Sequence, residues 1–326
     1  MNIPTCIRQN ISLKKYNWFE LGGLANYFAN PKNHEDLQSV ITFSHEKNLP
    51  IKILGLGANV LISDSGYSGI IMRLYNSNIS HYYINDETGI LKADAGCTIE
   101  ELIDYCLNTA FLFGLEEFSG IPSTVGGALF INLHYYSFLI SQFIYNADIY
   151  DIATKKIITV TADWFEFGYD TSKVKSNNNY IILSASFLLN RNTPLYAEYA
   201  KGRNVEIIRH RHNRYPYQKT CGCFFQNISL EEAPINNTGK KILAAAYYLD
   251  KIGVKGELKI NDSSVSFRHA NMIIHNGEGT AEDVIRIARI MQKKVYDQYG
   301  ILLTPECELI GFNSYPLYTQ LDINNE

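Results

Sequence analysis

The chain has 326 residues, of which 19% are charged, and its formal net charge is −4 at pH 7. This length allows two or three domains with sizeable cores, and the acidic balance argues against a general nucleic-acid binder, which usually carries a basic domain or stripe. No apolar run approaches the roughly 20 residues that a membrane span needs, so no contact with a membrane is expected.

The six cysteines are scattered along the chain, and the N-terminus lacks the apolar core of a secretory leader. We therefore interpret them as the reduced thiols of a cytoplasmic protein. Cys221 and Cys223 have no matching second pair, so their spacing does not predict a zinc site and no metal is expected. The short basic run at residues 209–214 is expected to serve a local anion.

In chain order, residues 1–16 are expected to be a short lead-in. A turn at Gly22-Gly23 then precedes a short strand that ends near Pro31. The next helix has Asn33 as its N-cap and carries apolar residues at helical spacing, namely Leu37, Val40 and Ile41. A strand, a helix and a strand that lead to a phosphate turn are typical of the opening of an α+β nucleotide domain.

The chain is organised around a predicted strand at residues 51–54 that runs through a Gly-x-Gly-Ala-Asn turn into another strand. Two glycines two residues apart permit backbone angles that other residues disfavour, and they remove side chains that would keep a phosphate from the amide N–H groups. An ordinary tight β-turn is the alternative. The predicted phosphate cradle consists of Leu54, Gly55, Leu56, Gly57, Ala58, Asn59 and Val60.

Three further strands are predicted, over residues 70–74, 82–84 and 90–95, and a helix over residues 99–108 follows with Thr98 as its N-cap. A second Gly-rich turn comes next. Either turn alone could be a tight β-turn, but two in one domain favour one extended pyrophosphate ligand held from both sides. The candidate cofactor residues of the second turn are Gly120, Ile121, Pro122, Ser123, Thr124, Gly126 and Gly127.

Neither turn has the fingerprint of the Rossmann fold. The pattern G-x-G-x-x-G requires a glycine at the position of Val60, and it requires a helix where residues 60–62 are predicted to form a strand. The doubly wound nucleotide fold is therefore excluded.

Residues 140–190 are predicted to be mostly strands, with the alternation of a half-covered sheet. A linker and a helix are expected from Asn190 to Arg209, with Pro194 at the break, and we expect a domain boundary here. The C-terminal part is predicted to contain helices over residues 241–250 and 281–299, a closing strand over residues 302–311 and a loose tail. Of these, the helix over residues 281–299 has the clearest ends, with Thr280 as its N-cap and Gly300 after it.

Several ordered motifs resemble the UDP-N-acetylenolpyruvoylglucosamine reductase family, the flavoenzymes called MurB. The resemblance covers residues 14 to 311, and its specificity comes from the order and spacing of short segments. These are Phe19 to Gly23, Gly55 to Leu61, Gly120-Ile121-Pro122, Gly126-Gly127-Ala128, Cys223 to Asn227, Val254-Lys255-Gly256, Ser266 to Asn271, and Pro305-Glu306.

The resemblance implies an α+β fold. An FAD-binding domain of the vanillyl-alcohol-oxidase (PCMH) type, made of two α+β lobes, would span residues 17–204, and a smaller C-terminal α+β substrate domain would span residues 205–311, with a tail over residues 312–326. Both Gly-rich turns would hold the pyrophosphate of FAD. No nucleic-acid or membrane partner is implied, and a monomer is expected.

The reaction that the resemblance implies is the reduction of UDP-N-acetylglucosamine enolpyruvate to UDP-N-acetylmuramate with NADPH, in peptidoglycan precursor synthesis. Hydride would pass from NADPH to the flavin and from flavin N5 to the vinyl carbon. The carbon next to the carboxylate must afterwards be protonated. The expected partner is therefore a UDP-sugar.

Four positions match residues with roles in the family, and a fifth, Tyr136, is a further candidate for substrate binding. Cys223 stands where the family usually has the serine that protonates the enol, and a thiol keeps a proton donor there. Glu306 matches the glutamate that assists the developing enolate. Arg214, where the family has lysine, and Asn227 match positions that bind or place the substrate diphosphate, and Tyr136 keeps its place. A buried structural cysteine, a surface glutamate and a solvated arginine are the alternatives.

Other positions depart from the family pattern. Asp170 stands where the family carries a catalytic arginine. A cation about 4 Å from a carboxylate is worth roughly 1 to 4 kcal/mol, and an anion there is repulsive by a similar amount, so Asp170 cannot take the arginine's role. Residues 132–137 also carry bulky side chains where relatives have small ones. The motifs on the flavin side therefore match better than those on the substrate side.

Three functions follow from this pattern. The first is the standard MurB reaction, with Arg191 or Arg268 as a replacement for the missing arginine. The second is a MurB-like reductase for a cationic or neutral enoyl substrate, which Asp170 would tolerate better than a carboxylate. The third is a flavin-binding protein without turnover.

Overall fold

The structure is a computed structural model that describes residues 3–74, 76–235 and 239–324. Residues 1–2 of the predicted lead-in and residues 325–326 of the predicted tail lie outside these ranges. The described chain folds into two compact units, each assembled from three segments. The first unit comprises the residues up to Gln9, Tyr27–Leu56 and Gly69–Arg211, and the second comprises Asn10–Asn26, Gly57–Ser68 and the chain from His212 onwards.

A six-stranded sheet forms the centre of the first unit, in the order β12-β11-β13-β7-β6 with β8 paired to β13. All of its strand pairs are antiparallel. In the central strand Ala185, Phe187 and Leu189 are buried in the core, but Ser184 and Ser186 are buried as well. The prediction of a half-covered sheet was therefore wrong over residues 184–187, where both faces are covered. Its strands are β6 (Ile79–Tyr83), β7 (Thr88–Asp94), β8 (Leu112–Phe113), β11 (Ile144–Asp151), β12 (Lys156–Val160) and β13 (Tyr180–Arg191).

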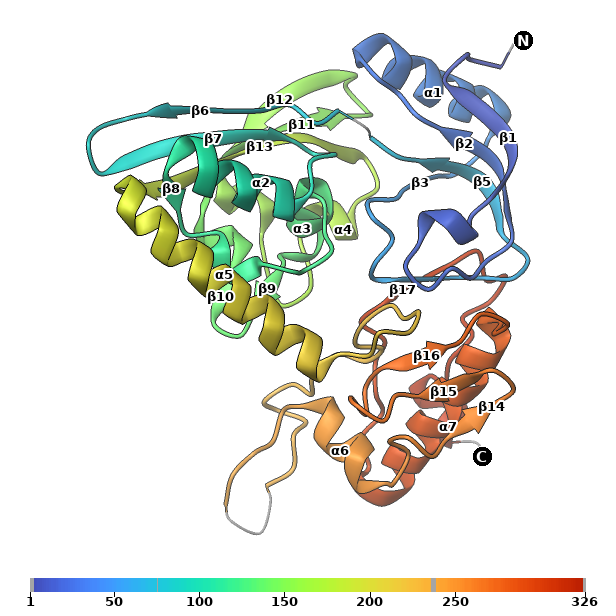
Figure 1. The fold of residues 1–326 in the computed structure, drawn as a ribbon. Helices are drawn as coiled ribbons and strands as arrows, with labels where there is room; N and C mark the ends of the chain where they lie inside the picture. Colours follow the sequence, from blue (N-terminus) through green and yellow to red (C-terminus); the bar gives the residue numbers. More distant parts are fainter. Residues whose placement is uncertain (1–2, 75, 236–238, 325–326) are drawn as a thin grey trace. The chain divides into compact units, whose positions relative to one another are not determined.

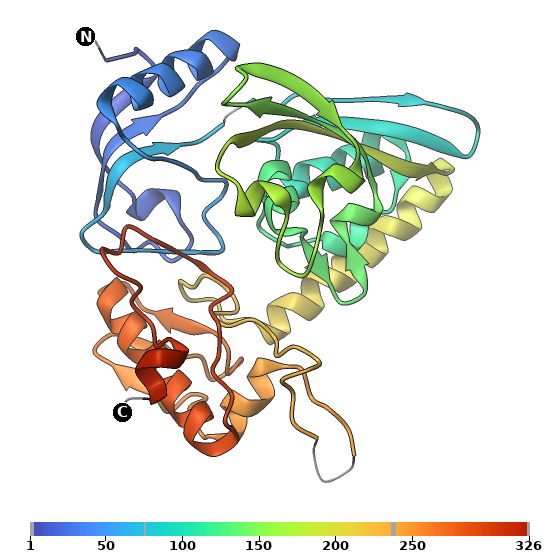
Figure 2. The same ribbon diagram turned by 180° about the vertical axis from the view of Figure 1, so that it is seen from behind.

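Helices α2, α3 and α5 lie on one side of this sheet, as Figures 1 and 2 show. Thr98 caps α2 in a capping box with Glu101, as predicted. The other regular elements of this layer are short. The bounds are α2 (Ile99–Tyr105) with a π-helical turn at Cys106–Ala110, α3 (Val125–Ile131), α4 (Lys173–Ser176), α5 (Pro194–Arg214), β9 (His134–Tyr135), β10 (Phe138–Leu139) and 3-10 turns at Glu116–Phe118, Ile140–Gln142 and Ala162–Phe165.

A four-stranded sheet has the order β1-β2-β5-β3, with β3 and β5 parallel. Helix α1 begins after the N-cap Asn33, and its apolar face packs on Ile70 and Met72 as predicted. The predicted lead-in contains a strand that the sequence analysis did not single out, because Ile7 joins this core. The bounds are β1 (Ile7–Ser12), a 3-10 turn at Lys14–Tyr16, β2 (Leu24–Ala29), α1 (His34–Lys47), β3 (Ile51–Ile53) and β5 (Tyr67–Met72).

The second unit is built on a three-stranded sheet in the order β14-β15-β16, with α7 against one face (Figure 1). Strand β4 pairs in parallel with β17, which joins the segment after the first Gly-rich turn to the C-terminal part of the chain. The bounds are β4 (Val60–Ile62), α6 (Ala245–Lys251), β14 (Lys259–Ile260), β15 (Ser263–Val265), β16 (Ile273–His275), α7 (Ala281–Tyr299), β17 (Glu308–Ile310) and α8 (Gln320–Asn324).

Helix α7 has the predicted ends. Thr280 accepts a hydrogen bond from the backbone N–H of Asp283, and Gly300 adopts φ +67° at the C-terminal end. The carboxylate of Asp64 accepts two further backbone N–H groups of the first turn, those of Ala281 and Glu282. The segment after the first Gly-rich turn thus also caps the longest helix of its unit.

Three C-terminal predictions were wrong in extent. The helix expected from residue 241 begins at Ala245, because the preceding residues are extended and the carbonyl of Leu243 accepts the amide of Ile228. The closing strand is confined to β17. The tail is not loose over its described part, since Leu317 is buried and Gln292 contacts the backbone of Tyr318.

Two elements of the first unit differ from the linear reading of the sequence. The second Gly-rich segment is a turn only as far as Thr124, and its two adjacent glycines lie in the first turn of α3. Helix α5 begins at Pro194 as predicted and continues to Arg214, through the predicted boundary at residues 204 and 205. The domain bounds stay a prediction.

No helix in the described part of the chain has the length and apolar character that crossing a bilayer requires.

Candidate active site

The first Gly-rich turn presents a run of unused amide donors. The backbone N–H groups from Gly55 to Asn59 donate to no acceptor among the residues that the structure describes. Asn59 also buries its side-chain oxygen Oδ1 without a hydrogen-bond partner in the described chain. Buried polar groups are normally paired, so free donors at a glycine turn indicate a place for an anionic ligand.

The glycines of this turn are also required by packing. Gly57 adopts φ +69°, and a Cβ atom there would lie 2.3 Å from the carbonyl oxygen of Tyr16. A Cβ atom on Gly55 would lie 2.8 Å from Oγ1 of Thr124. The tight-turn interpretation and the cradle interpretation therefore hold together, because the same missing side chains allow both the close packing and the exposed amides.

Gly57→Ala should lower the free energy of unfolding more than the backbone angle alone accounts for. Gly253 is the matched control, since its φ is +71° and a Cβ atom there would meet nothing within 4 Å. A left-handed alanine costs about 1 to 2 kcal/mol, so we expect that loss for Gly253→Ala and at least about twice it for Gly57→Ala. Equal losses in denaturant titrations of the two variants would show that the backbone clash does not exist.

The second Gly-rich segment meets the first one within the first unit, at the contact between Gly55 and Thr124. Its amides, however, are mostly used inside the protein. Those of Val125 and Gly126 donate to the carbonyls of Cys97 and Ala95, and that of Gly127 donates to Thr124 Oγ1. A Cβ atom on Gly126 would lie 3.2 Å from Ala95 Cβ, so this glycine lets α3 approach the end of β7. Cofactor contacts by this segment stay a proposal.

Glu306 is tied to the first Gly-rich turn within the second unit. The side-chain amide of Asn59 donates to the carbonyl of Glu306 at 3.4 Å, and the amide of Glu308 donates to the carbonyl of Asn59 at 3.0 Å. These bonds continue into the parallel pair of β4 with β17. The C-terminal glutamate is therefore held beside the residues that end the predicted phosphate cradle.

Cys223 and Glu306 lie on neighbouring backbone segments of the same unit. The amide of Glu306 donates to the carbonyl of Phe224 at 2.8 Å, and Phe225 forms an isolated antiparallel bridge with Pro305. Asn271 fixes this segment, because its side chain donates to and accepts from the backbone of Phe225. Both candidate catalytic residues are half-buried, and the backbone bond between Glu306 and Phe224 sets their two segments side by side. A joint catalytic role for the two side chains stays a proposal.

A second thiol lies two residues before Cys223 but has a different environment. Burial raises the pKa of the Cys221 thiol well above its usual range, and a hydrogen bond with Cys307 acts in the same direction. Cys221 and Cys307 are both buried, whereas Cys223 is half-buried. A buried thiol with a raised pKa is expected to be inert, so Cys223 stays the predicted proton donor of this pair.

Arg214, the last residue of α5, lies near His269 of the Ser266 to Asn271 motif. Burial, together with the positive charges of Arg214 and Lys255, lowers the pKa of His269 from its ordinary value of 6.5 to about 4. His269 Nδ1 accepts a hydrogen bond from the amide of Asn271 at 3.3 Å, which requires a neutral nitrogen there. The neutral histidine thus leaves Arg214 and Lys255 as the cationic groups near it.

The buried His269 should make stability depend on pH. Between pH 6.5 and 4 the unfolded chain binds a proton that the folded chain does not, so the free energy of unfolding rises with pH in this window and is fully restored above it. The shift corresponds to about 3 kcal/mol. His269→Asn keeps a group that can accept the bond from Asn271, and the difference in free energy of unfolding between variant and parent should grow steadily from pH 4 to 6.5. A difference that stays constant across this range would contradict the assignment.

The two remaining predicted substrate residues, Asn227 and Tyr136, each contact a neighbouring residue of the protein. The side-chain oxygen of Asn227 accepts the amide of Ala245 at the start of α6, at 3.2 Å. Tyr136 is 67% exposed, has a φ of 52° and packs edge to face on Tyr135 with ring centroids 4.7 Å apart. Their contacts with a substrate stay a proposal.

Asp170 is buried, with only 3% of its surface exposed, and it pairs with a histidine that the sequence analysis did not single out. Its Oδ1 lies 3.3 Å from Nδ1 of His134. Its Oδ2 has no hydrogen-bond partner in the described part of the chain, and its backbone carbonyl accepts the ammonium of Lys175 at 2.7 Å. The anion at the position of the family's arginine therefore faces a group that can carry a positive charge.

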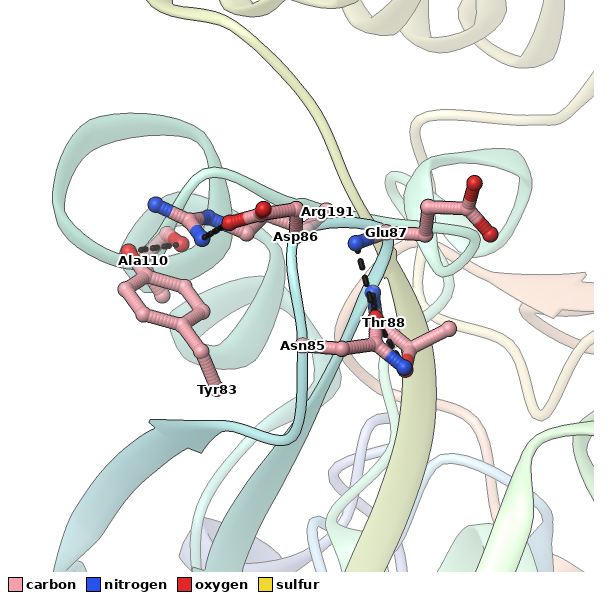
Figure 3. Close-up of polar contacts among 7 residues, drawn as sticks. All are labelled: Tyr83, Asn85, Asp86, Glu87, Thr88, Ala110 and Arg191. Carbon is pink, nitrogen blue, oxygen red and sulfur yellow. Dashed lines mark hydrogen bonds and ion pairs between the residues drawn. The ribbon is translucent and has the colours of Figure 1, made fainter.

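The two arginines considered as replacements are engaged elsewhere. In Figure 3 the guanidinium of Arg191 lies against Tyr83 and bonds to Asp86 at the turn between β6 and β7. The guanidinium of Arg268 donates to the carbonyls of His212 and Tyr215 and stacks on Tyr217. Each is held by partners within its own unit.

Sequence reasoning missed His134, Arg211 and Asp64. Arg211 Nε donates to the carbonyl of Gly120 at 3.2 Å, and its guanidinium lies over the ring of Tyr135. The basic run at residues 209–214 was a usable signal for Arg211. His134 and Asp64 gave none, since their partners are distant in sequence.

Comparison with known proteins places the chain in a family. A family model for the UDP-N-acetylenolpyruvoylglucosamine reductase C-terminal domain matches residues 214–310, and a model for an FAD binding domain matches residues 25–159. UDP-N-acetylenolpyruvoylglucosamine reductase 2 of Bacillus thuringiensis subsp. konkukian is 32% identical over 306 residues, which cover 94% of this chain and 93% of that protein. The chain belongs to this reductase family.

Other comparisons agree with this assignment to the MurB family. The reductase of Chlamydia felis is 31% identical over 313 residues, which cover 96% of this chain and 97% of that protein. The crystal structure of MurB from Thermus caldophilus has the same fold, with a TM-score of 0.73, 24% identity, and coverage of 94% of this chain and all of that one. The predicted fold class, an FAD-binding domain followed by a smaller C-terminal α+β domain, is confirmed.

The residues present fit the diphosphate of FAD. The test is the row of amides from Gly55 to Asn59 that find no acceptor in the described chain, together with the left-handed Gly57 that aligns them. Successive free N–H groups around a glycine are suited to bind phosphate oxygens. The first Gly-rich turn passes this test with its own backbone, and the second provides the packing against which Gly55 rests.

Proposed function

We propose that this MurB family member is an FAD-dependent oxidoreductase that uses NADPH to convert UDP-N-acetylglucosamine enolpyruvate to UDP-N-acetylmuramate, a step of peptidoglycan precursor synthesis. The observation that carries the proposal is the backbone bond from Glu306 to Phe224, next to Cys223. It joins the backbone segments that carry the carboxyl of Glu306 and the thiol of Cys223, in the unit that also contains Gly57 to Asn59 of the cradle.

FAD would be held by the amides of the first Gly-rich turn, with Leu54 and Val60 at its two ends. Gly120 to Thr124 and the paired glycines Gly126 and Gly127 would line it from the second segment. When bound, FAD supplies hydride chemistry, taking hydride from NADPH and delivering it to the vinyl carbon of the substrate.

Cys223 supplies the proton. Reduction of the enolpyruvyl double bond leaves negative charge that spreads onto the carboxylate, and the carbon next to that carboxylate must receive a proton. The thiol of Cys223 donates it and is left as a thiolate, which regains a proton from solvent before the next turnover. A thiol with a pKa near 8.5 in its unperturbed state is a better donor than a serine hydroxyl.

Glu306 stabilises the charge that develops on the substrate carboxylate. In its protonated form, the carboxyl can donate a hydrogen bond to an oxygen that becomes more basic in the transition state. Its backbone is fixed on both sides, by Phe224 and by Asn59, so the side chain begins from a defined position. Arg214, Asn227 and Tyr136 would place the UDP part of the substrate.

We further propose a monomeric cytoplasmic enzyme. Its six cysteines are all free in the structure, which suits a reducing compartment.

Purified protein tests this function directly. It should be yellow, and its NADPH oxidation should rise when the enolpyruvyl UDP-sugar is added. Bound FAD with no substrate-dependent oxidation would contradict the standard reaction. Reduction by NADPH without a response to this sugar would then favour another enoyl substrate, and no reduction at all would favour a binding role.

A further inference from the structure

We propose that His134, held by Asp170, is a positioning cation that binds the carboxylate of the enolpyruvyl group. The inference rests on the proposed function and deepens it. Asp170 then serves as the partner that keeps the imidazole charged and oriented, and it makes no contact with the substrate itself.

The first observation is the charge balance between Asp170 and His134. Only 3% of the surface of Asp170 is exposed, and one of its two carboxylate oxygens has no hydrogen-bond partner in the described chain. A buried carboxylate without a compensating cation is costly, and an imidazolium 3.3 Å away supplies that compensation.

The second step is orientation. The loop that carries Asp170 is anchored to the C-terminal end of α3, because Asn132 donates to the carbonyl of Gly168 and Ser172 donates to that of Phe130. Asp170 itself has a φ of 52°, a left-handed angle in a turn closed by the bond from Gly168 to Thr171. The carboxylate is thereby fixed against β9, and it fixes the imidazole ring in turn.

The third step is location within the first unit. His134 follows α3, whose first turn contains Gly126 and Gly127, and its side chain remains 26% exposed. The next residue, Tyr135, lies beneath the guanidinium of Arg211, which also bonds to the carbonyl of Gly120. The histidine thus lies two residues from the candidate substrate residue Tyr136 and is linked through Arg211 to the second Gly-rich segment.

The charged and titratable groups around the ring set its response to pH. Asp170 and the ring of Tyr169 face it from the loop before α4, with ring centroids 5.0 Å apart in the second case. Lys175 of α4 donates to the backbone carbonyl of Asp170, and Tyr135 completes β9 after His134, with Tyr136 in the turn that follows. Asp170 provides the negative charge in this set. Lys175 provides a positive charge, which it places on the backbone carbonyl of Asp170.

The experiment measures substrate affinity on the oxidised holoenzyme, by the change in flavin absorbance, from pH 5 to 9. His134→Gln should weaken binding of the enolpyruvyl UDP-sugar by about ten- to a hundredfold at low pH, the range that loss of a hydrogen bond to a charged group gives. It should leave UDP-N-acetylglucosamine, which lacks the carboxylate, bound as in the parent. His134→Lys should restore affinity and remove the pH dependence over this range.

Asp170→Asn separates positioning from a merely structural role. Asparagine tolerates the left-handed angle and keeps the shape, so the variant should fold and bind FAD. The pH above which affinity for the enolpyruvyl sugar falls should move down by about one unit or more, because an adjacent carboxylate shifts such a titration by about one to three units.

Two results would overturn the inference. One is His134→Gln binding the enolpyruvyl sugar as tightly as the parent while the parent remains active, which leaves the proposed function intact. The other is equal weakening of both sugars by His134→Gln, with no shift of the pH profile by Asp170→Asn, which would make the pair structural. If the parent neither binds nor turns over the enolpyruvyl sugar, the proposed function fails first and the inference fails with it.

Discussion

Cys223→Ala should abolish reduction of the enolpyruvyl sugar while leaving the flavin reducible by NADPH. Positioned general acids contribute about 10² to 10⁴ in rate, so kcat with the sugar should fall by that factor. Rapid mixing with NADPH alone should show flavin bleaching at the parental rate, because Cys223 donates its proton only to the sugar. Cys223→Ser should keep more activity than the alanine variant, since a hydroxyl still carries a proton.

The control for this prediction lies two residues earlier. Cys221 is buried with a raised pKa, so Cys221→Ala should cost stability and leave the chemical step in place. The two cysteines share a segment but differ in burial, since Cys221 is buried and Cys223 is half-buried. If Cys221→Ala lowers kcat as much as Cys223→Ala, the effect belongs to the packing of the segment and the thiol of Cys223 is not the acid.

Glu306→Gln should lower kcat with the sugar by about 10² to 10³, with a smaller change in KM. This is the range for removing one group aimed at charge that develops in a transition state. The amide of glutamine keeps a hydrogen-bond donor but cannot carry the charge or release a proton. Steady-state kinetics of the variant, with flavin reduction by NADPH as an internal reference, measure the effect.

A neighbouring glutamate provides the comparison. Glu308 is also half-buried, and its backbone belongs to β17. Glu308→Gln keeps the β17 backbone bonds, because those are made by the main chain. It should therefore behave as the parent. Similar losses in the two variants would mean that the reaction depends on the negative charge around both glutamates, and that Glu306 has no specific role.

Local signals in the sequence predicted the elements whose ends are fixed by neighbouring residues. Helix α7 begins and ends where Thr280 and Gly300 indicated, because caps act within one turn. The elements that were missed or misplaced depend on distant partners. Strand β1 forms because Ile7 reaches a core made by later residues, and α6 starts late because residues before it bond to Ile228.

The candidate site divides in the same way. The cradle at Gly55 to Asn59 was readable because glycine acts on its own backbone. A shared site for Cys223 and Glu306 was predicted from family motifs and stays a proposal, and the structure adds the backbone bond from Glu306 to Phe224. The partner of Asp170 was not readable. The reversed charge at Asp170 was visible in the sequence. The histidine that pairs with it, His134, lies 36 positions earlier in the chain.

The most direct test of the account is a balance between NADPH and product on the purified holoenzyme. We predict that each NADPH oxidised yields one molecule of the lactyl ether, detected by mass spectrometry as the substrate with two hydrogens added, and that oxidation stops when the enolpyruvyl sugar is exhausted. NADPH oxidation that proceeds equally without the sugar, or that consumes it without forming the lactyl ether, would contradict the account.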